Sequence, residues 1–488
     1  MRLRNTLILL LLLLGLGAYV YFVEYPAAQQ ETKKKTLFDF KVDEVTQIAL
    51  TYPDREIVLK KTGDEWVLVK PIETEADETI VKTLVNGIAD CEVKKTVEEE
   101  PTDLSIFGLD APATRVKVSL GERELPEILV GKTAPIGSSA YIQRVDEKKV
   151  LLASSAFRSG VDKKVKDLRN KTILRFSDEE VRRIALQGDG KDLALVKKDD
   201  QWQIERPAAF GADGTVVRSY LSTLRSLRAI DFPDDEGKDL SAYGLDAPRL
   251  SVTLWVGKDE DQRQVLIGKE NEKKELFVKT GARPVVYTVS DWVYRDLNKT
   301  LNDLRDKVLL AVDKEKATAI EVKRADGTQF KLMKEGDNKW VLEKAEGKLA
   351  ENAVTQFVND VAELKGYEVA ADDVADLKSF GLDPAAVSMH VGGEGGAEVG
   401  TILLGQRERE GKKEYTGARA GGTTVFLVRD YLYSRLDKQA RDFIEQPTPT
   451  AAPVTPGVAP DLEGDTEEDE GEFDEEDFDE EEFDEDPG

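Results

Sequence analysis

The chain has 488 residues, and its 69 Lys and Arg against 96 Asp and Glu give a formal net charge of −27. This length suffices for three domains of ordinary size, each with its own hydrophobic core. A single cysteine, Cys91, excludes an intrachain disulfide and a multi-cysteine zinc site. A single histidine, His390, leaves little material for proton relays or histidine-rich metal sites.

An uncharged apolar run of 17 residues, Leu7–Val23, follows the polar segment 1–6. As a helix this run would be about 25 Å long, at the short end of what spans a bilayer. Arg2 and Arg4 precede it, so the positive-inside rule predicts a cytoplasmic amino terminus. We therefore predict a single transmembrane helix at 7–23, a juxtamembrane linker at 24–36, and a chain whose bulk is extracytoplasmic.

Two alternatives to this anchor stay open. A cleaved signal peptide would have a shorter apolar region and a small-x-small site after it, where this chain offers Pro26 and Ala28. The inverted topology, with the bulk of the chain in the cytoplasm, is favoured by Lys33, Lys34 and Lys35 beyond the apolar run.

Three sequence landmarks recur with a period near 137 residues, which indicates an internal triplication. The landmarks are Trp66, Trp202 and Trp340; Gly108, Gly244 and Gly381 in FGLDAP, YGLDAP and FGLDPA; and Gly131, Gly268 and Gly405 in ILVGK, VLIGK and ILLGQ. We predict three tandem modules, 37–174, 175–304 and 305–445. Their fold class is predicted to be α+β, with mainly antiparallel sheet and packed helices.

Each module begins with alternating apolar residues around a polar turn, as in REIVLKKTGDEWVLVKP. That pattern is typical of a β-hairpin. The Trp of the second strand is predicted to be a core anchor, because an aromatic side chain buries a large area. The alternative is a Trp that stacks on a ligand.

A helix is predicted after each hairpin. Asp77 and Asp213 stand where a helix N-cap belongs, and Glu351 is expected to take that place in the third module. Apolar residues at helical spacing predict the buried stripe of each helix: Ile80, Leu84 and Ile88; Val216, Tyr220 and Leu224; Val354 and Val358. Cys91 aligns with Leu227 beside this stripe and is expected to be a small buried apolar residue.

The FGLDAP segment could be either a ligand-binding loop or a structural joint. If Gly108 follows a short helix in the left-handed conformation, a Schellman motif brings Leu104 and Leu109 into contact. The same leucine spacing recurs around Gly244 and Gly381, so we predict a helix terminator. The following carboxylates, expected to stabilise a turn rather than to catalyse, are Asp110, Asp246 and Asp383.

The rest of each module reads as short strands followed by amphipathic stretches such as SDWVYRDLNKTLNDLRDKVLL. His390 aligns with Lys117 and Thr253 between apolar positions of a strand, and is expected to face solvent. The sequence lacks a phosphate-binding glycine loop, GxSxG, HExxH and CxxC. No catalytic, cofactor-binding or metal-ligating residue is predicted, although an unrecognised carboxylate pair stays open.

The carboxyl-terminal part changes composition twice. Residues 446–460 form a Pro/Thr-rich linker, and 461–488 contain nineteen Asp and Glu without Lys or Arg, which leaves −8 for the remainder. Self-repulsion predicts an acidic disordered tail, which argues against nucleic acid as a partner. The tail is interpreted as a solvating segment, with a contact for a basic partner or weak Ca²⁺ binding as alternatives.

With these motifs in place, the chain resembles the bacterial domain of unknown function 4340 family over roughly residues 38–443. The resemblance rests on DEWVLVKP and DQWQIERP, FGLDAP and YGLDAP, and ILVGK and VLIGK. It implies an envelope protein of the bacterial inner membrane that is auxiliary to an ABC transporter, because relatives are often encoded beside transporter components of the gliding-motility type. It implies no catalytic residue.

The leading expectation is therefore a non-enzymatic, single-pass membrane protein in contact with the lipid bilayer. Its three modules would serve as a scaffold or interaction arm for a protein partner in the membrane or envelope, an ABC transporter subunit by resemblance. The alternative is an envelope enzyme that acts on polysaccharide or peptidoglycan through a carboxylate pair. Such an enzyme requires two acidic residues in one module's cleft with no counterparts in the others.

Overall fold

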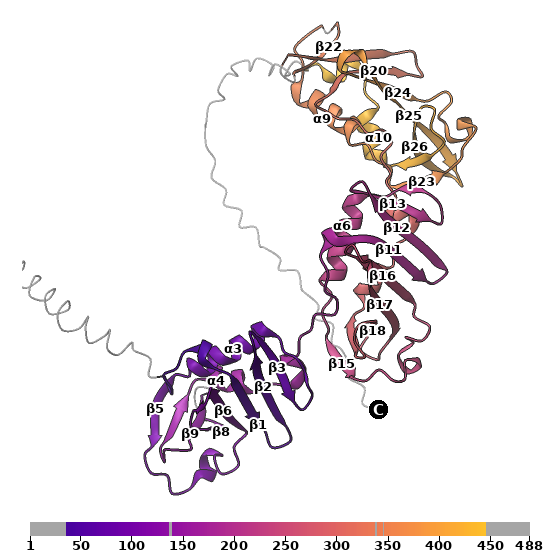
Figure 1. The fold of residues 1–488 in the computed structure, drawn as a ribbon. Coiled ribbons are helices and arrows are strands. Elements are labelled where there is room, and N and C mark those ends of the chain that lie inside the picture. Colours follow the sequence, from indigo (N-terminus) through magenta and orange to yellow (C-terminus); the bar gives the residue numbers. More distant parts are fainter. Residues whose placement is uncertain (1–35, 136–138, 337–338, 345, 446–488) are drawn as a thin grey trace, which may run out of the picture. The chain divides into compact units, whose positions relative to one another are not determined.

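The computed structural model describes residues 36–135, 139–336, 339–344 and 346–445 (Figure 1). The predicted anchor Leu7–Val23 and the predicted acidic tail lie outside these residues. Among the residues described, no helix has both the length and the apolarity needed to cross a bilayer.

Three antiparallel sheets follow one another along the chain and share one strand order. The orders are β4-β3-β2-β1-β6-β8-β9-β10-β5 with β7 beside β6, then β14-β13-β12-β11-β16-β17-β18-β19-β15, and then β22-β21-β20-β24-β25-β26-β27-β23. All strand pairs named here are antiparallel. The predicted triplication and the mainly antiparallel α+β modules are confirmed.

The first module holds its α-helices against one face of its sheet. The strands are β1 (Gln47–Thr51), β2 (Glu56–Thr62), β3 (Glu65–Lys70), β4 (Thr74–Glu75), β5 (Val93–Glu98), β6 (Thr114–Leu120), β7 (Arg123–Glu124), β8 (Ile128–Thr133), β9 (Ala140–Arg144) and β10 (Val150–Ala153). The helices are η2 (Val42–Glu44), α3 (Glu78–Ala89), η3 (Leu104–Phe107), α4 (Ser155–Val161) and α5 (Val165–Leu168). Helix α3 connects β4 at one edge of the sheet to β5 at the other.

The second module repeats this order. Its strands are β11 (Val181–Gly188), β12 (Lys191–Lys198), β13 (Gln201–Arg206), β14 (Phe210–Gly211), β15 (Asp231–Asp234), β16 (Leu250–Val256), β17 (Asp261–Glu270), β18 (Glu275–Thr280) and β19 (Val286–Ser290). Its helices are η4 (Asp178–Glu180), α6 (Gly214–Arg225), η5 (Ser241–Tyr243), α7 (Trp292–Leu297) and α8 (Leu301–Leu304).

The third module follows the same plan. Its strands are β20 (Ala317–Arg324), β21 (Gln329–Glu335), β22 (Lys339–Leu342), β23 (Glu368–Ala371), β24 (Val387–Gly393), β25 (Glu398–Arg409), β26 (Lys412–Arg419) and β27 (Val425–Val428). Its helices are α9 (Glu351–Ala362), η6 (Leu377–Phe380), η7 (Glu394–Gly396), α10 (Asp430–Leu436) and η8 (Ala440–Phe443). Compact units divide after Lys307, so the first two modules form one unit and the third forms the other.

Each module has its own apolar core between sheet and helices. The cores run from Leu37 to Leu168, from Ile173 to Leu304 and from Leu309 to Phe443. Trp66 is 8% exposed and belongs to the first core, while Trp202 and Trp340 are partly buried against the second and third. The prediction of a core-anchoring Trp is confirmed for Trp66 and holds in part for Trp202 and Trp340.

The helix caps agree with the sequence in two modules and differ in the third. Asp77 accepts hydrogen bonds from the backbone N–H groups of its second and third following residues, and Asp213 does the same. The prediction for Glu351 was wrong, because the N-cap of α9 is Ala350, which has no capping side chain, and Glu351 is the first helical residue. A carboxylate there still stabilises the helix through its dipole.

The buried helical stripe contains the predicted positions and extends to their neighbours. Ile80 and Val216 are only partly buried. The fully buried helical residues are Val81, Leu84, Val85 and Ile88; Val217, Tyr220, Leu221 and Leu224; and, among apolar residues of α9, Val354, Phe357, Val358 and Val361. The helices are therefore rotated slightly from the predicted face, which lets a wider stripe meet the sheet.

The segment around Gly108 is a helix terminator, as predicted. Gly108 adopts φ 68°, its N–H donates to the carbonyl of Ser105 at 3.1 Å, and the N–H of Leu109 donates to the carbonyl of Leu104 at 3.0 Å. These two bonds define a Schellman motif. The same pair of bonds closes η5 and η6.

A capping carboxylate precedes each terminator, at a position that sequence reasoning missed. Asp103 accepts from the N–H of Ser105 at 2.8 Å, and Asp239 and Asp376 accept from the equivalent N–H groups. The hydrogen bonds from Ser105 lower the pKa of Asp103. By contrast, Asp110 is exposed and makes no side-chain hydrogen bond with the described residues, and the same holds for Asp246 and Asp383. The turn-stabilising role predicted for those three was wrong.

The terminator packs on the sheet face opposite the helices. Phe107 and Leu109 are buried against Leu129 and Val150, and the Phe107 ring lies 5.0 Å from that of Tyr141. A Cβ atom added to Gly131, the second recurrent glycine, would lie 2.2 Å from the carbonyl oxygen of Phe107. Only glycine therefore allows this approach of the terminator to strand β8.

We predict that Gly131→Ala destabilises the first module by about 1–3 kcal/mol or more, because the added methyl group must displace backbone. The matched control is Gly87→Ala in α3, where an added Cβ meets nothing within 4 Å. Alanine favours a helix over glycine by about 1 kcal/mol, so Gly87→Ala is expected to be neutral or stabilising. Urea midpoints of the full chain, followed through exposure of Cys91, compare the two; equal midpoints would contradict the packing argument.

Burial raises the pKa of the Cys91 thiol to about 12. Since Cys91 is 1% exposed and only a thiolate attacks disulfide reagents, we predict that native protein at pH 8 reacts at least ~100-fold more slowly than unfolded protein. Absorbance after addition of an aromatic disulfide measures both rates. Rapid reaction of the native chain would show that the first core opens easily.

Candidate functional site

Two similar grooves lie beside the tryptophans of the first two modules. The first, of about 420 Å³, is lined by Trp66, Asp43 and Asp64 among others, and the second, of about 620 Å³, by Glu179, Asp200 and Trp202. Asp43 and Asp64 recur as Glu179 and Asp200. The other acidic lining residues do not recur between these two modules: Glu78 of the first groove aligns with Gly214, and Asp178 and Asp306 of the second align with Val42 and Asn170. The acidic pair next to each tryptophan is therefore shared by the first two modules, while the remaining acidic lining residues differ between them.

The titratable residues that the sequence singled out lie apart. Cys91 is part of the first core, whereas His390 lies on β24 between the buried Met389 and Val391. The His390 side chain is 44% exposed, and its Nδ1 lies 3.0 Å from the hydroxyl of Thr401. The predicted outward orientation of His390 is confirmed. No group of three His, Cys, Asp or Glu side chains suited to a metal ion occurs among the described residues.

The side chains that do converge lie where the first two modules join. Residues 169–172 connect the modules, and the backbone of this connector is hydrogen-bonded to one module or the other. On one side the N–H of Asn170 donates to the carbonyl of Glu75 at 2.9 Å. On the other the N–H of Ala229 donates to the carbonyl of Lys171 at 2.8 Å, and Thr172 forms a bridge with Arg228. The chain thus passes from the β4 edge of one module directly to the segment after α6 of the next.

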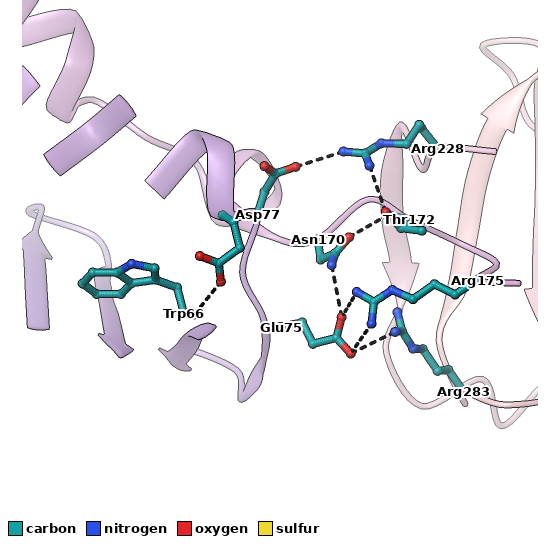
Figure 2. Close-up of polar contacts among 9 residues, drawn as sticks. Trp66, Glu75, Asp77, Asn170, Thr172, Arg175, Arg228 and Arg283 are labelled. Carbon is teal, nitrogen blue, oxygen red and sulfur yellow. Dashed lines mark hydrogen bonds and ion pairs between the residues drawn. The ribbon is translucent and has the colours of Figure 1, made fainter. Parts of the chain in front are cut away.

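Glu75 is the centre of a polar network at this junction, which Figure 2 shows. Its carboxylate accepts from Arg175 at 2.6 Å, from Arg283 at 3.0 Å and from the amide of Asn170 at 3.1 Å. Arg283 comes from the β18–β19 loop, and Arg175 from the start of the second module. One carboxylate of the first module therefore binds two guanidinium groups of the second.

Asp77 links the helix cap to the same junction. One carboxylate oxygen caps α3, while the other pairs with Arg228 at 2.9 Å (Figure 2). Arg228 also donates to the hydroxyl of Thr172 at 2.9 Å, and the N–H of Thr172 donates to Asn170 at 2.9 Å. The Arg228 guanidinium therefore links the connector 169–172 to helix α3 of the first module.

Two more ion pairs lie beside β15. Arg169 pairs with Asp235 at 2.6 Å, and its guanidinium lies 3.8 Å from the centre of the Phe232 ring. Lys166 pairs with Asp231 at 2.6 Å, and this hydrogen bond raises the pKa of Lys166. Burial acts to raise the pKa of Asp231, but the hydrogen bonds from Lys166 and the Phe232 N–H outweigh it and lower that pKa. The pair is lost only as pH falls through the lowered Asp231 pKa or rises through the raised Lys166 pKa.

These contacts fix the geometry of the junction more than they add stability. Most of the partners are partly exposed, and such pairs contribute about 0–1 kcal/mol each. The Arg169 side chain is 6% exposed, so its charge requires Asp235 and the Phe232 ring. Sequence reasoning missed the junction because its partners lie far apart along the chain, and the available signal was the run of basic residues at 163–171.

We predict that Asp77→Ala destabilises the first module by about 1–2 kcal/mol more than Asp77→Asn, because asparagine retains the helix cap and alanine does not. Asp77→Asn and Arg228→Gln should each cost less than ~1 kcal/mol, since both remove only the partly exposed pair. Urea midpoints of the full chain at low and high salt separate the contributions. Equal losses for Ala and Asn would show that the ion pair stabilises the module more than the cap does.

Three regions of the chain match one protein family, described as Domain of unknown function (DUF4340). The matched residues are 66–236, 202–365 and 340–448, so each match begins at a recurrent tryptophan and the first two cross a connector between modules. No curated protein matches the sequence. Because the three matches together cover well over half of the 488 residues, the chain belongs to the DUF4340 family.

Proposed function

We propose that this protein is a non-enzymatic, single-pass membrane protein whose three modules form an extracytoplasmic scaffold or interaction arm. The hydropathy of Leu7–Val23 supports the anchor, and Arg2 and Arg4 support the orientation. The proposed location is the inner membrane of a bacterium. The proposed partner is a membrane or envelope protein, an ABC transporter subunit by resemblance.

The observation that carries this proposal is the connector at 169–172. A flexible linker lets domains sample many orientations, and ordering it later costs conformational entropy. Here the backbone pairs with the first module up to Asn170 and with the second from Lys171 onward, and the Glu75 and Asp77 networks secure both sides. Such a junction suits an arm that must hold binding surfaces at a defined spacing.

The use of recurrent residues supports the same proposal. The glycines and capping aspartates shared by the modules serve folding in the described residues, and the shared tryptophans pack against the apolar cores. The alternative enzyme requires a carboxylate pair specific to one module, whereas Asp43 and Asp64 beside Trp66 recur as Glu179 and Asp200 beside Trp202. No specific observation favours the enzyme.

The test is co-purification of the tagged full chain from membranes solubilised in a mild detergent. We expect a transporter subunit to elute with the chain in near-stoichiometric amount and to be absent from a parallel preparation of untagged chain. Protease treatment of intact spheroplasts should remove the modules, because the proposed orientation exposes them. Recovery of the chain alone, or full protection of the modules, would contradict the proposal.

A further inference from the structure

A small groove of about 180 Å³ lies in the second module beside the junction. It is lined by Ile173, Leu174, Arg175, Gln262, Arg263, Gln264, Thr280, Ala282 and Arg283. None of these described residues is acidic, although the chain as a whole carries −27. Four larger grooves among the described residues each have at least two carboxylates in their lining.

Strand register shows what distinguishes this place from its counterparts in the other modules. Thr280 pairs with Val265, and the same register position holds Arg144 in the first module and Arg419 in the third. In the first module the Arg144 guanidinium lies over the Phe38 ring, 5.0 Å from its centre, and pairs with Glu147. The second module therefore has a short side chain where the other two have arginine.

The charge at one position of the loop that follows is also reversed. Arg283 stands three residues after Thr280, as Glu147 stands three residues after Arg144, and the loops have equal length. The first module satisfies its arginine within the loop. In the second module Arg283 and Arg175 share the single carboxylate of Glu75. Arg263 pairs with the exposed Asp261 at 3.5 Å, so the groove keeps an excess of positive charge.

Thr280 supplies an independent sign of a ligand. Its side chain is 2% exposed, and its hydroxyl has no hydrogen-bond partner among the described residues. A buried hydroxyl without a partner is costly, so natural structures rarely keep one without a reason. Tyr287 and Thr288 also have unpartnered buried hydroxyls, but neither lines this groove.

We propose that this groove binds a small oxyanion, the phosphate or carboxylate group of a ligand. Guanidinium groups bind such oxyanions through charge-assisted hydrogen bonds, often two at a time. The arginines at the groove would supply the positive charge, and the Thr280 hydroxyl would donate to one oxygen of the anion. This site goes beyond the proposed scaffold role and does not depend on it.

The test uses the purified full chain in detergent, titrated separately with inorganic phosphate and with acetate at constant ionic strength. Heat of binding gives the affinity, and the shift of the unfolding midpoint confirms that the ligand binds native protein. Arg263→Gln removes one of the guanidinium groups that line the groove, so we expect affinity to fall at least about tenfold. Thr280→Val removes only the hydroxyl and should weaken binding about threefold.

The matched control is Arg182→Gln, which removes one positive charge from an exposed position of β11 and should leave the affinity unchanged. Unfolding midpoints without ligand verify that each variant folds, and the near-isosteric Thr280→Val keeps the test valid if Arg263→Gln does not fold. Binding of phosphate, acetate or both by the wild type, with the expected losses, supports the site and identifies the oxyanion. If neither phosphate nor acetate binds, or if wild type and Thr280→Val have equal affinities, the proposed site is overturned.

Discussion

The modules depend on the contact between a backbone carbonyl and a glycine that has no room for a side chain. In the first module the Phe107 carbonyl approaches Gly131, and in the second the Tyr243 carbonyl approaches Gly268 at the same 2.2 Å from an added Cβ. In the third module Gly405 meets the carbonyl of Gly381 in this way. Because the contact needs both the terminator and the strand glycine, the two landmarks recur together in the sequence.

This contact determines how the sheet is covered. Helices cover one face, while the terminator brings aromatic and leucine side chains onto the other, as with Phe107 against Tyr141 and Tyr243 against Phe277. A sheet covered on both sides buries more apolar area than one open to water. The glycines therefore serve packing within each module, which leaves binding chemistry to residues that differ between modules.

Short-range patterns in the sequence were sufficient to predict most of the elements that recur in the modules. The hairpins, the caps at Asp77 and Asp213 and the terminators were predicted because each depends on residues a few positions apart. The edge strand β5 was missed, because it is almost entirely exposed and VKKTVE shows no apolar alternation. The cap of α9 was assigned wrongly because Ala350 leaves no signal in the sequence.

The junction and the groove could not be predicted in the same way, since their partners are brought together only by tertiary structure. Glu75 and Arg283 are 208 positions apart, and neither residue belongs to a recurrent motif. Their relation becomes visible once strand register aligns the modules, because equal positions can then be compared.

Comparing equivalent positions of the repeats shows where the modules differ, and these differences bear on function. The first module pairs Arg144 with Glu147 in its own loop, whereas the second has Thr280 and Arg283 at these positions and takes a carboxylate from its neighbour. The fold does not require Thr280 and Arg283 at these two positions, because the first module reaches the same strand order with Arg144 and Glu147. A buried hydroxyl without a partner, next to a positive charge that depends on other groups, is costly for an isolated module. Partners from outside the second module explain this arrangement. Glu75 of the first module pairs with Arg283, and the proposed oxyanion accepts from the Thr280 hydroxyl.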